Sequence, residues 1–247
     1  MQVLVGTCGF PTSRKTLYSA LDAVELQETF YNMPNPDKMA QLRRETPDFH
    51  FTAKVFQGLT HQPTSPTFRR TRGFKPTERH GLLKPTKENL ELWQQFAEAA
   101  SPLKPEVLVF QTPPSLKPEP HIYDFFASIT GRWRLAWEPR GETYKDPRLI
   151  QKVAELGVVI ALDPLKRDPL TSALQYFRLH GVGKGEVNYR YKYTEDDLRK
   201  LASVVRSLKA ETVYVMFNNV YMHQDALQFK QLLNATQRAP PGPEDAA

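Results

Sequence analysis

The sequence predicts a single-domain α/β fold, a TIM-like (β/α)8 barrel with parallel strands. The chain has 247 residues, close to the roughly 250 that is typical of such a barrel. Eight short runs are nearly continuous in hydrophobicity, which is typical of strands covered on both faces. Helical patterns alternate with these runs, as the crossovers of a parallel sheet require.

Each predicted strand is an apolar, β-rich run. We expect the strands to cover Gln2–Val5, Ala23–Leu26, His50–Val55, Val107–Phe110, Arg134–Trp137, Val158–Leu162, Tyr176–Leu179 and Val213–Phe217. The predicted helices are Pro36–Glu45, the segment KENLELWQQFAEAA after Thr86, Pro120–Ile129, Asp146–Leu156, Thr194–Leu208 and His223–Leu233. An open, doubly wound sheet is the alternative, but Gly6-Thr7-Cys8-Gly9 does not match the glycine-rich dinucleotide motif that usually follows its first strand.

Domain organisation and compartment follow from composition. We expect one barrel domain over residues 1–238 and a disordered tail over residues 239–247 (APPGPEDAA). No run approaches the roughly 18 apolar residues of a membrane span, and the N-terminus lacks the pattern of a signal peptide. The single cysteine, Cys8, excludes an internal disulfide, so a cytoplasmic location is expected.

The net charge of +6 is concentrated in a long loop after the third strand. Residues 57–84 contain one acid, Glu78, and six basic residues: Arg69, Arg70, Arg72, Lys75, Arg79 and Lys84. This basic loop either attracts phosphates and acidic ligands or is a solvated surface loop.

Polar and ionisable residues stand at or just after nearly every predicted strand, and barrel enzymes place their active sites at these ends. The predicted catalytic residues are Glu25, Glu138, Asp163 and His180. The predicted substrate-binding residues are Gly6, Lys54, His61, Gln111, Arg140, Arg178, Tyr189 and Asn218.

Each of these interpretations has a structural alternative. Glu25 could form a buried ion-pair network with Lys54 and Arg178 that performs no catalysis. Cys8 has no adjacent base and is better read as a small packed residue than as a nucleophile. Gln111 could serve only the turn that follows it. The alternating series Tyr189, Tyr191 and Tyr193 is either a ligand platform or a ribbon with one aromatic face.

The sequence does not identify a cofactor. Glu138, Asp163 and His180 end three successive strands and could hold a divalent metal. The sequence contains no familiar metal motif, and the cations Lys54, Arg140 and Arg178 would repel a metal ion. Lys54 could also form a Schiff base, since lysines on barrel strands can act in that way.

The sequence resembles the YecE-like family, also called domain-of-unknown-function family 72. The matching segments run from the first strand to the last helix: VGTCGF (5–10), VELQETFYNMP (24–34), FTAKV with Leu59-Thr60-His61, VFQTPPS (109–115), Glu138-x-Arg140, FRLHG (177–181) and VYVMFNN (213–219) with His223. The resemblance implies a TIM-like barrel with these residues at one end, and no established reaction. Cys8, Gln27 and the residues after Arg140 depart from the usual family pattern.

Two functions from different classes follow. The first is an enzyme, such as a hydrolase, that acts on a phosphate-bearing or otherwise anionic substrate, with Arg140, Arg178 and Lys54 as anion ligands and a histidine, His180 or His61, as acid or base. The second is a non-catalytic nucleic-acid-binding protein that uses the basic loop with Phe68, Phe74 and the tyrosine series. A scaffold with a vestigial site is a third reading, and the oligomeric state stays open.

Overall fold

The computed structural model describes residues 1–183 and 185–237, and its fold confirms the predicted barrel. Eight parallel strands form one sheet in the order β6-β5-β4-β3-β2-β1-β8-β7. The strands are β1 (Gln2–Cys8), β2 (Ala23–Leu26), β3 (His50–Lys54), β4 (Val107–Gln111), β5 (Leu135–Glu138), β6 (Val159–Ile160), β7 (Leu174–Leu179) and β8 (Thr212–Phe217). The predicted tail, residues 239–247, lies outside the described residues.

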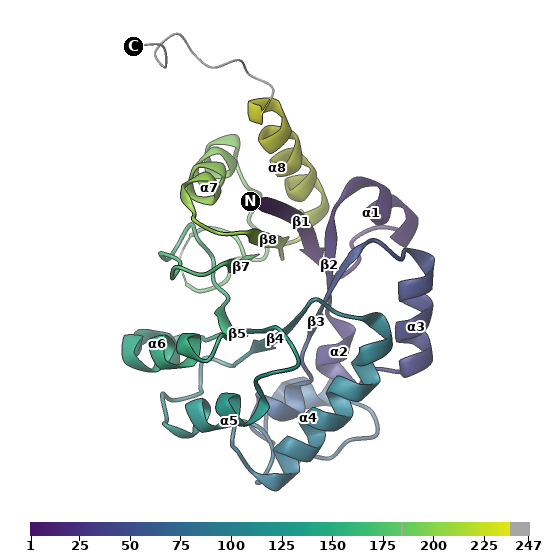
Figure 1. The fold of residues 1–247 in the computed structure, drawn as a ribbon, viewed down its shortest axis with the longest axis vertical. Helices are drawn as coiled ribbons and strands as arrows, with labels where there is room; N and C mark the ends of the chain where they lie inside the picture. Colours follow the sequence, from purple (N-terminus) through teal and green to yellow (C-terminus); the bar gives the residue numbers. More distant parts are fainter. Residues whose placement is uncertain (184, 238–247) are drawn as a thin grey trace.

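The helices surround the strands on the outside of the barrel (Figure 1). All six predicted helices are present: α3 (Pro36–Glu45), α4 (Lys87–Ala100), α5 (His121–Ile129), α6 (Pro147–Glu155), α7 (Glu195–Ser207) and α8 (Met222–Gln237). Two short helices, α1 (Arg14–Ala20) and α2 (Glu28–Tyr31), were not predicted, because so few residues show no clear periodicity. None of the helices in the described residues is long and apolar enough to span a membrane.

In the described residues the barrel closes between the end of β6 and β7 through an isolated bridge rather than a continuous ladder. The prediction of Val158–Leu162 as a strand was too long, because only Val159–Ile160 forms a ladder with β5. Leu162 instead makes an isolated bridge to Phe177, in which the Arg178 amide donates to the Leu162 carbonyl at 2.9 Å. This bridge brings Asp163, the next residue, beside the end of β7.

The first strand extends past the predicted end at Val5 as far as Cys8, because Gly6, Thr7 and Cys8 pair with β2. Gly6 lies where the two backbones approach closely: a Cβ atom there would stand 2.2 Å from the Ala23 carbonyl oxygen. This contact explains why a glycine occupies the position. A contact between Gly6 and substrate stays a prediction.

Side chains along each strand alternate between the barrel interior and the helices. On β7, Tyr176 belongs to the interior cluster, whereas Phe177 and Leu179 pack in the larger core beneath the helices. The interior is filled by small and aromatic side chains, with the Tyr176 and Tyr214 rings stacked 5.4 Å apart. The barrel is therefore a packed core, and its chemistry is confined to the end where the strands finish.

Candidate active site at the barrel mouth

The guanidinium of Arg178 on β7 is the centre of the barrel mouth. The side chain is fully buried, and it donates to both oxygens of Glu25 on β2, with Nε 3.0 Å from Oε2 and Nη2 2.8 Å from Oε1. Its Nη1 donates to Oε2 of Glu138 on β5. One cation thus joins two carboxylates from strands that are not neighbours in the sheet.

Glu25 has no exposed surface, and both of its carboxylate oxygens accept hydrogen bonds. The Tyr176 hydroxyl donates to Oε2 at 2.9 Å, and the Gln27 amide donates to Oε1. Gln27 is one of the positions that departs from the family pattern, and here it completes the shell of this carboxylate. The arrangement is that of the predicted ion-pair network, with Arg178 rather than Lys54 as the partner of Glu25, and it favours a supporting role for Glu25.

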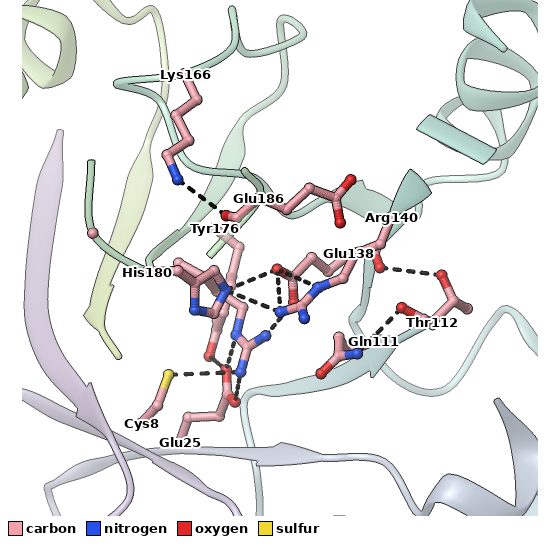
Figure 2. Close-up of polar contacts among 12 residues, drawn as sticks. Cys8, Glu25, Gln111, Thr112, Glu138, Arg140, Lys166, Tyr176, His180 and Glu186 are labelled. Atoms are coloured by element: carbon pink, nitrogen blue, oxygen red, sulfur yellow. Dashed lines mark hydrogen bonds and ion pairs between the residues drawn. The ribbon is translucent and has the colours of Figure 1, made fainter. Parts of the chain in front are cut away.

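Glu138, Arg140 and His180 point toward one another at the mouth (Figure 2). Arg140 donates to Oε1 of Glu138 from Nη2 at 3.0 Å, and His180 Nε2 lies 2.8 Å from the same oxygen. Burial alone would raise the pKa of Glu138, but the charges of Arg140 and Arg178 hold it well below the ordinary value. Glu138 is therefore an anion at every physiological pH.

The protonation of His180 follows from its partner. Because an ionised Glu138 can only accept, its 2.8 Å contact assigns the proton to Nε2 of His180. Burial lowers the pKa of His180 to about 4, so the ring is neutral near pH 7. The remaining nitrogen, Nδ1, is a buried acceptor without a hydrogen-bond partner among the described residues.

Asp163 follows the point where β6 and β7 meet and is oriented by its own loop. Oδ1 accepts a hydrogen bond from the Leu165 amide at 3.0 Å, whereas Oδ2 is buried and has no hydrogen-bond partner in the described chain. Burial raises the pKa of Asp163 to about 6, with the Leu165 amide opposing the shift. A carboxyl group in this range can both hold and release a proton near neutral pH.

A cavity of about 580 Å³ opens beside these groups, at the ends of β5, β6 and β7. Its walls include Glu138, Asp163 and His180 together with four cations: Arg140, Lys145, Lys166 and Arg167. Lys166 donates to the carbonyl oxygen of Glu186 at 3.0 Å and has no carboxylate within 4 Å in the described chain. Arg167 lies over the Tyr144 ring at 3.5 Å and pairs with Glu186 at 3.4 Å.

Lys54 and His61 lie elsewhere at the mouth, against the Phe30 ring. The Lys54 amine is 3.9 Å from the ring centroid, and the His61 ring packs edge-on to it at 5.1 Å. Burial lowers the pKa of His61 to about 3 and that of Lys54 to about 7, and the Arg178 charge adds to the shift at Lys54. His61 is therefore a neutral ring, hydrogen-bonded through Nδ1 to the Thr60 hydroxyl at 2.8 Å.

The other predicted substrate-binding residues have peripheral contacts. Gln111 is buried and donates to the Thr112 carbonyl at 3.2 Å, as its turn-forming alternative requires. Tyr189 is exposed and meets the His180 ring edge-on at 5.8 Å. Asn218 is partly buried, and its amide continues the barrel wall by donating to Leu179. Substrate contacts by these three residues stay predictions.

Local contacts distinguish between the two interpretations of Cys8 and between the two interpretations of the tyrosine series. Cys8 is buried, with Sγ 3.7 Å from Arg178 Nη2, and burial raises the pKa of the thiol, as expected for a packed residue. The tyrosine series is not one aromatic face. The Tyr193 hydroxyl is buried against the Gly181 amide, and Tyr191 donates to Asp197, which leaves Tyr189 beside the site.

The arrangement does not support the metal hypothesis for Glu138, Asp163 and His180. Within residues 1–183 and 185–237, no group of three or more His, Cys, Asp or Glu side chains could hold a metal ion. The physical reason is that both Glu138 oxygens accept hydrogen bonds from guanidinium groups, whose positive charge would repel a metal ion.

The sequence interpretation missed Lys166, Arg167 and Glu186, which line the cavity. All three lie in the loops that follow β6 and β7 rather than at the strand ends. The Lys166-Arg167 pair stands three residues after Asp163, and that spacing was the available signal. Tyr176 was also missed as a partner of Glu25, although it lies two residues before Arg178 and so shares its face of β7.

Comparison with known proteins agrees with this picture. Residues 12–247 match the family described as "Protein of unknown function DUF72". The chain belongs to this family. The YecE-like resemblance of its motifs is thereby confirmed, since both names denote the same family.

Solved structures show the same fold at low sequence identity. A DUF72 family protein from Enterococcus faecalis V583 is 21% identical, with a TM-score of 0.73 and 94% and 98% of the two chains covered. One from Thermotoga maritima MSB8 is 24% identical, with a TM-score of 0.66 and coverage of 95% and 100%. A protein named SacUVDE is 9% identical, with a TM-score of 0.54 and coverage of 96% and 98%. No curated protein matches the sequence.

Replacement of Arg178 tests the network directly. Arg178→Gln should lower the free energy of unfolding by about 3–5 kcal/mol, because it leaves Glu25 and Glu138 buried without their cation. Urea denaturation followed by circular dichroism measures the change. Arg199→Gln is the control, since it breaks an exposed pair with Glu195 that is worth about 1 kcal/mol or less. Equal losses in the two variants would contradict the account.

Proposed function

We propose that this protein is an enzyme that binds a small phosphate-bearing or otherwise anionic substrate at the barrel mouth and hydrolyses it with Asp163 as the proton-handling group. The observation that carries the proposal is the cavity at the ends of β5, β6 and β7. It combines several cations with a carboxyl group whose pKa is raised to about 6.

The cations supply binding. Lys166 and Arg167 reach the cavity from the loop after β6, and Arg140 reaches it from the end of β5. Guanidinium and ammonium groups at a half-enclosed site bind phosphate and carboxylate oxygens through charge-assisted hydrogen bonds. Lys166 is the least committed of the three, because its amine donates to backbone carbonyl oxygens rather than to a carboxylate.

Asp163 and His180 both line the cavity, and each has one buried acceptor atom without a hydrogen-bond partner in the described chain, Oδ2 and Nδ1. An ionised Asp163 can take a proton from water as the water attacks the substrate. The neutral His180, oriented by Glu138 through Nε2, can accept a hydrogen bond from the same water or from a substrate hydroxyl. In this assignment Glu25 and Glu138 position other groups through their bonds to Arg178.

A screen of phosphate esters, beginning with p-nitrophenyl phosphate, tests the proposal through Asp163→Asn. The variant should lose about 100-fold or more in kcat, since general base catalysis typically contributes 10²–10⁴-fold. For the wild type, kcat should rise as the pH increases through about 6, because the base must be ionised.

Asp168→Asn is the matched control, because Asp168 is an exposed carboxylate on the same loop. It should hydrolyse the same ester at the wild-type rate. An Asp163→Asn enzyme as active as Asp168→Asn, or a rate that falls as the pH rises through 6, would refute Asp163 as the base.

Binding of single-stranded nucleic acid by the basic loop is a second candidate, favoured by the exposure of Arg69, Arg70, Arg72, Lys75 and Arg79. Of these, Arg79 pairs with Glu88, and Arg70 lies over the Tyr31 ring. Phe74 weakens the stacking part of this proposal, because it packs against Phe56, Phe68 and His80 and so has little free face for a base.

Fluorescence anisotropy with a labelled oligonucleotide tests this candidate. The logarithm of the binding constant should fall linearly with the logarithm of salt concentration, with a slope of about −0.7 per phosphate contacted. Substituting Arg69 and Arg72 by serine should make that slope shallower, whereas Arg199→Gln on α7 should leave it unchanged. Absence of binding at low salt would exclude the candidate.

A further inference from the structure

Lys54 is a lysine of the barrel mouth that the proposed hydrolysis does not use. It is the last residue of β3, and only 7% of the residue is exposed. In the described chain its amine has neither a carboxylate within 4 Å nor a hydrogen bond, and its one specific contact is the Phe30 ring at 3.9 Å. A buried ammonium group without an acidic partner is costly and therefore uncommon.

The charges around Lys54 disfavour its protonated form. Arg178 on β7 and Arg140 after β5 repel the ammonium group, while Glu25 and Glu138 attract it. Both carboxylates are already bonded to arginine, so their attraction is largely balanced. With burial as the largest cause, the pKa of Lys54 falls to about 7, and about half of the amine is neutral at that pH.

His61 adds no charge to this balance. Its pKa is lowered to about 3, so the ring beside Phe30 is neutral. A lysine amine that is desolvated, flanked by cations and packed on an aromatic ring has the properties of a lysine nucleophile. A purely structural lysine at a barrel end would instead be expected to face a carboxylate.

We propose that Lys54 is a nucleophile that forms an imine with the aldehyde or ketone group of an anionic ligand bound at the barrel mouth. The neutral Nζ attacks the carbonyl carbon, and the C=O π electrons move to oxygen, which takes up one of the two protons of the attacking nitrogen. The resulting carbinolamine loses its hydroxyl group and one proton from nitrogen as water, and a C=N bond forms. No oxidant or reductant is consumed.

The nearby cations define the class of ligand. Arg140 lies close enough to influence both Lys54 and His61 electrostatically, and it also lines the cation-rich cavity. A phosphate or carboxylate bound by Arg140 would keep an attached carbonyl group at the barrel mouth, where β3 ends in Lys54. The inference goes beyond the proposed hydrolysis and does not depend on it, because an imine is detected on the protein itself.

Reductive trapping with pyridoxal 5′-phosphate, an anionic aldehyde, tests the inference. The wild-type protein is incubated with the probe at pH 7, the imine is reduced with sodium borohydride, and labelled lysines are identified by peptide mass spectrometry. Lys54 should be labelled at least about tenfold faster than exposed Lys87 and Lys209, because an ordinary lysine is less than ~0.1% neutral at this pH.

Three comparisons make the result decisive. Lys54→Arg should lose the fast label, whereas Lys87→Arg should retain it. Pyridoxal, which lacks the phosphate, should label Lys54 more slowly, and inorganic phosphate should protect the site.

If Lys54→Arg does not fold, the ranking of labelling rates among the lysines of the wild-type chain still tests whether Lys54 is the nucleophile. Labelling of Lys87 and Lys209 without Lys54 would overturn the nucleophile, and equal rates for pyridoxal and its phosphate would overturn the anionic class.

Discussion

The buried guanidinium of Arg178 binds Glu25 and Glu138 across the barrel, and the rest of the mouth is arranged around this contact. Charges removed from water must be paired, and removal of one partner leaves the others costly. Arg178 therefore ties together β2, β5 and β7, and it sits directly above the packed tyrosine layer of the interior. The position of Glu138 then sets those of Arg140 and His180, which both bond to its Oε1.

This pairing divides the ionisable groups of the site into two sets. Glu25 and Glu138 are committed to arginine, and Glu138 also fixes the tautomer of His180. Asp163 and Lys54 lack such partners, so burial dominates and shifts their pKa values toward neutrality from opposite directions. Groups whose environments separate their proton affinities in this way are where acid–base or nucleophilic chemistry is expected. The division supports the assignment of Asp163 to proton transfer and of Lys54 to covalent capture.

Much of this arrangement was predictable from the sequence, because parallel strands bring their carboxyl ends together. Hydrophobic runs and the helices between them gave the barrel, and the strand-end rule gathered Glu25, Glu138, Arg178 and His180 before any contact was known. The ion pair of Glu25 with Arg178 was among the predicted contacts, but the bond from Arg178 to Glu138 was not, since it depends on strand register. The sixth strand was predicted, but its short length was not, because Val158–Leu162 is as apolar as a longer strand. Lys166 was not predicted as a cavity residue, because it reaches the cavity through the conformation of a loop. Loop conformation has no periodicity that the sequence could reveal.

The division between committed and free carboxyl groups can be measured by NMR titration of side-chain carboxyl carbons in the wild-type protein, with Asp163→Asn and Glu138→Gln used for assignment. The account predicts that the Asp163 signal titrates near pH 6 and that the Glu138 signal shows no titration above pH 4.5, its ordinary value. Titration of Glu138 near neutral pH would contradict the central role assigned to Arg178, and titration of Asp163 below pH 4 would contradict its assignment to proton transfer.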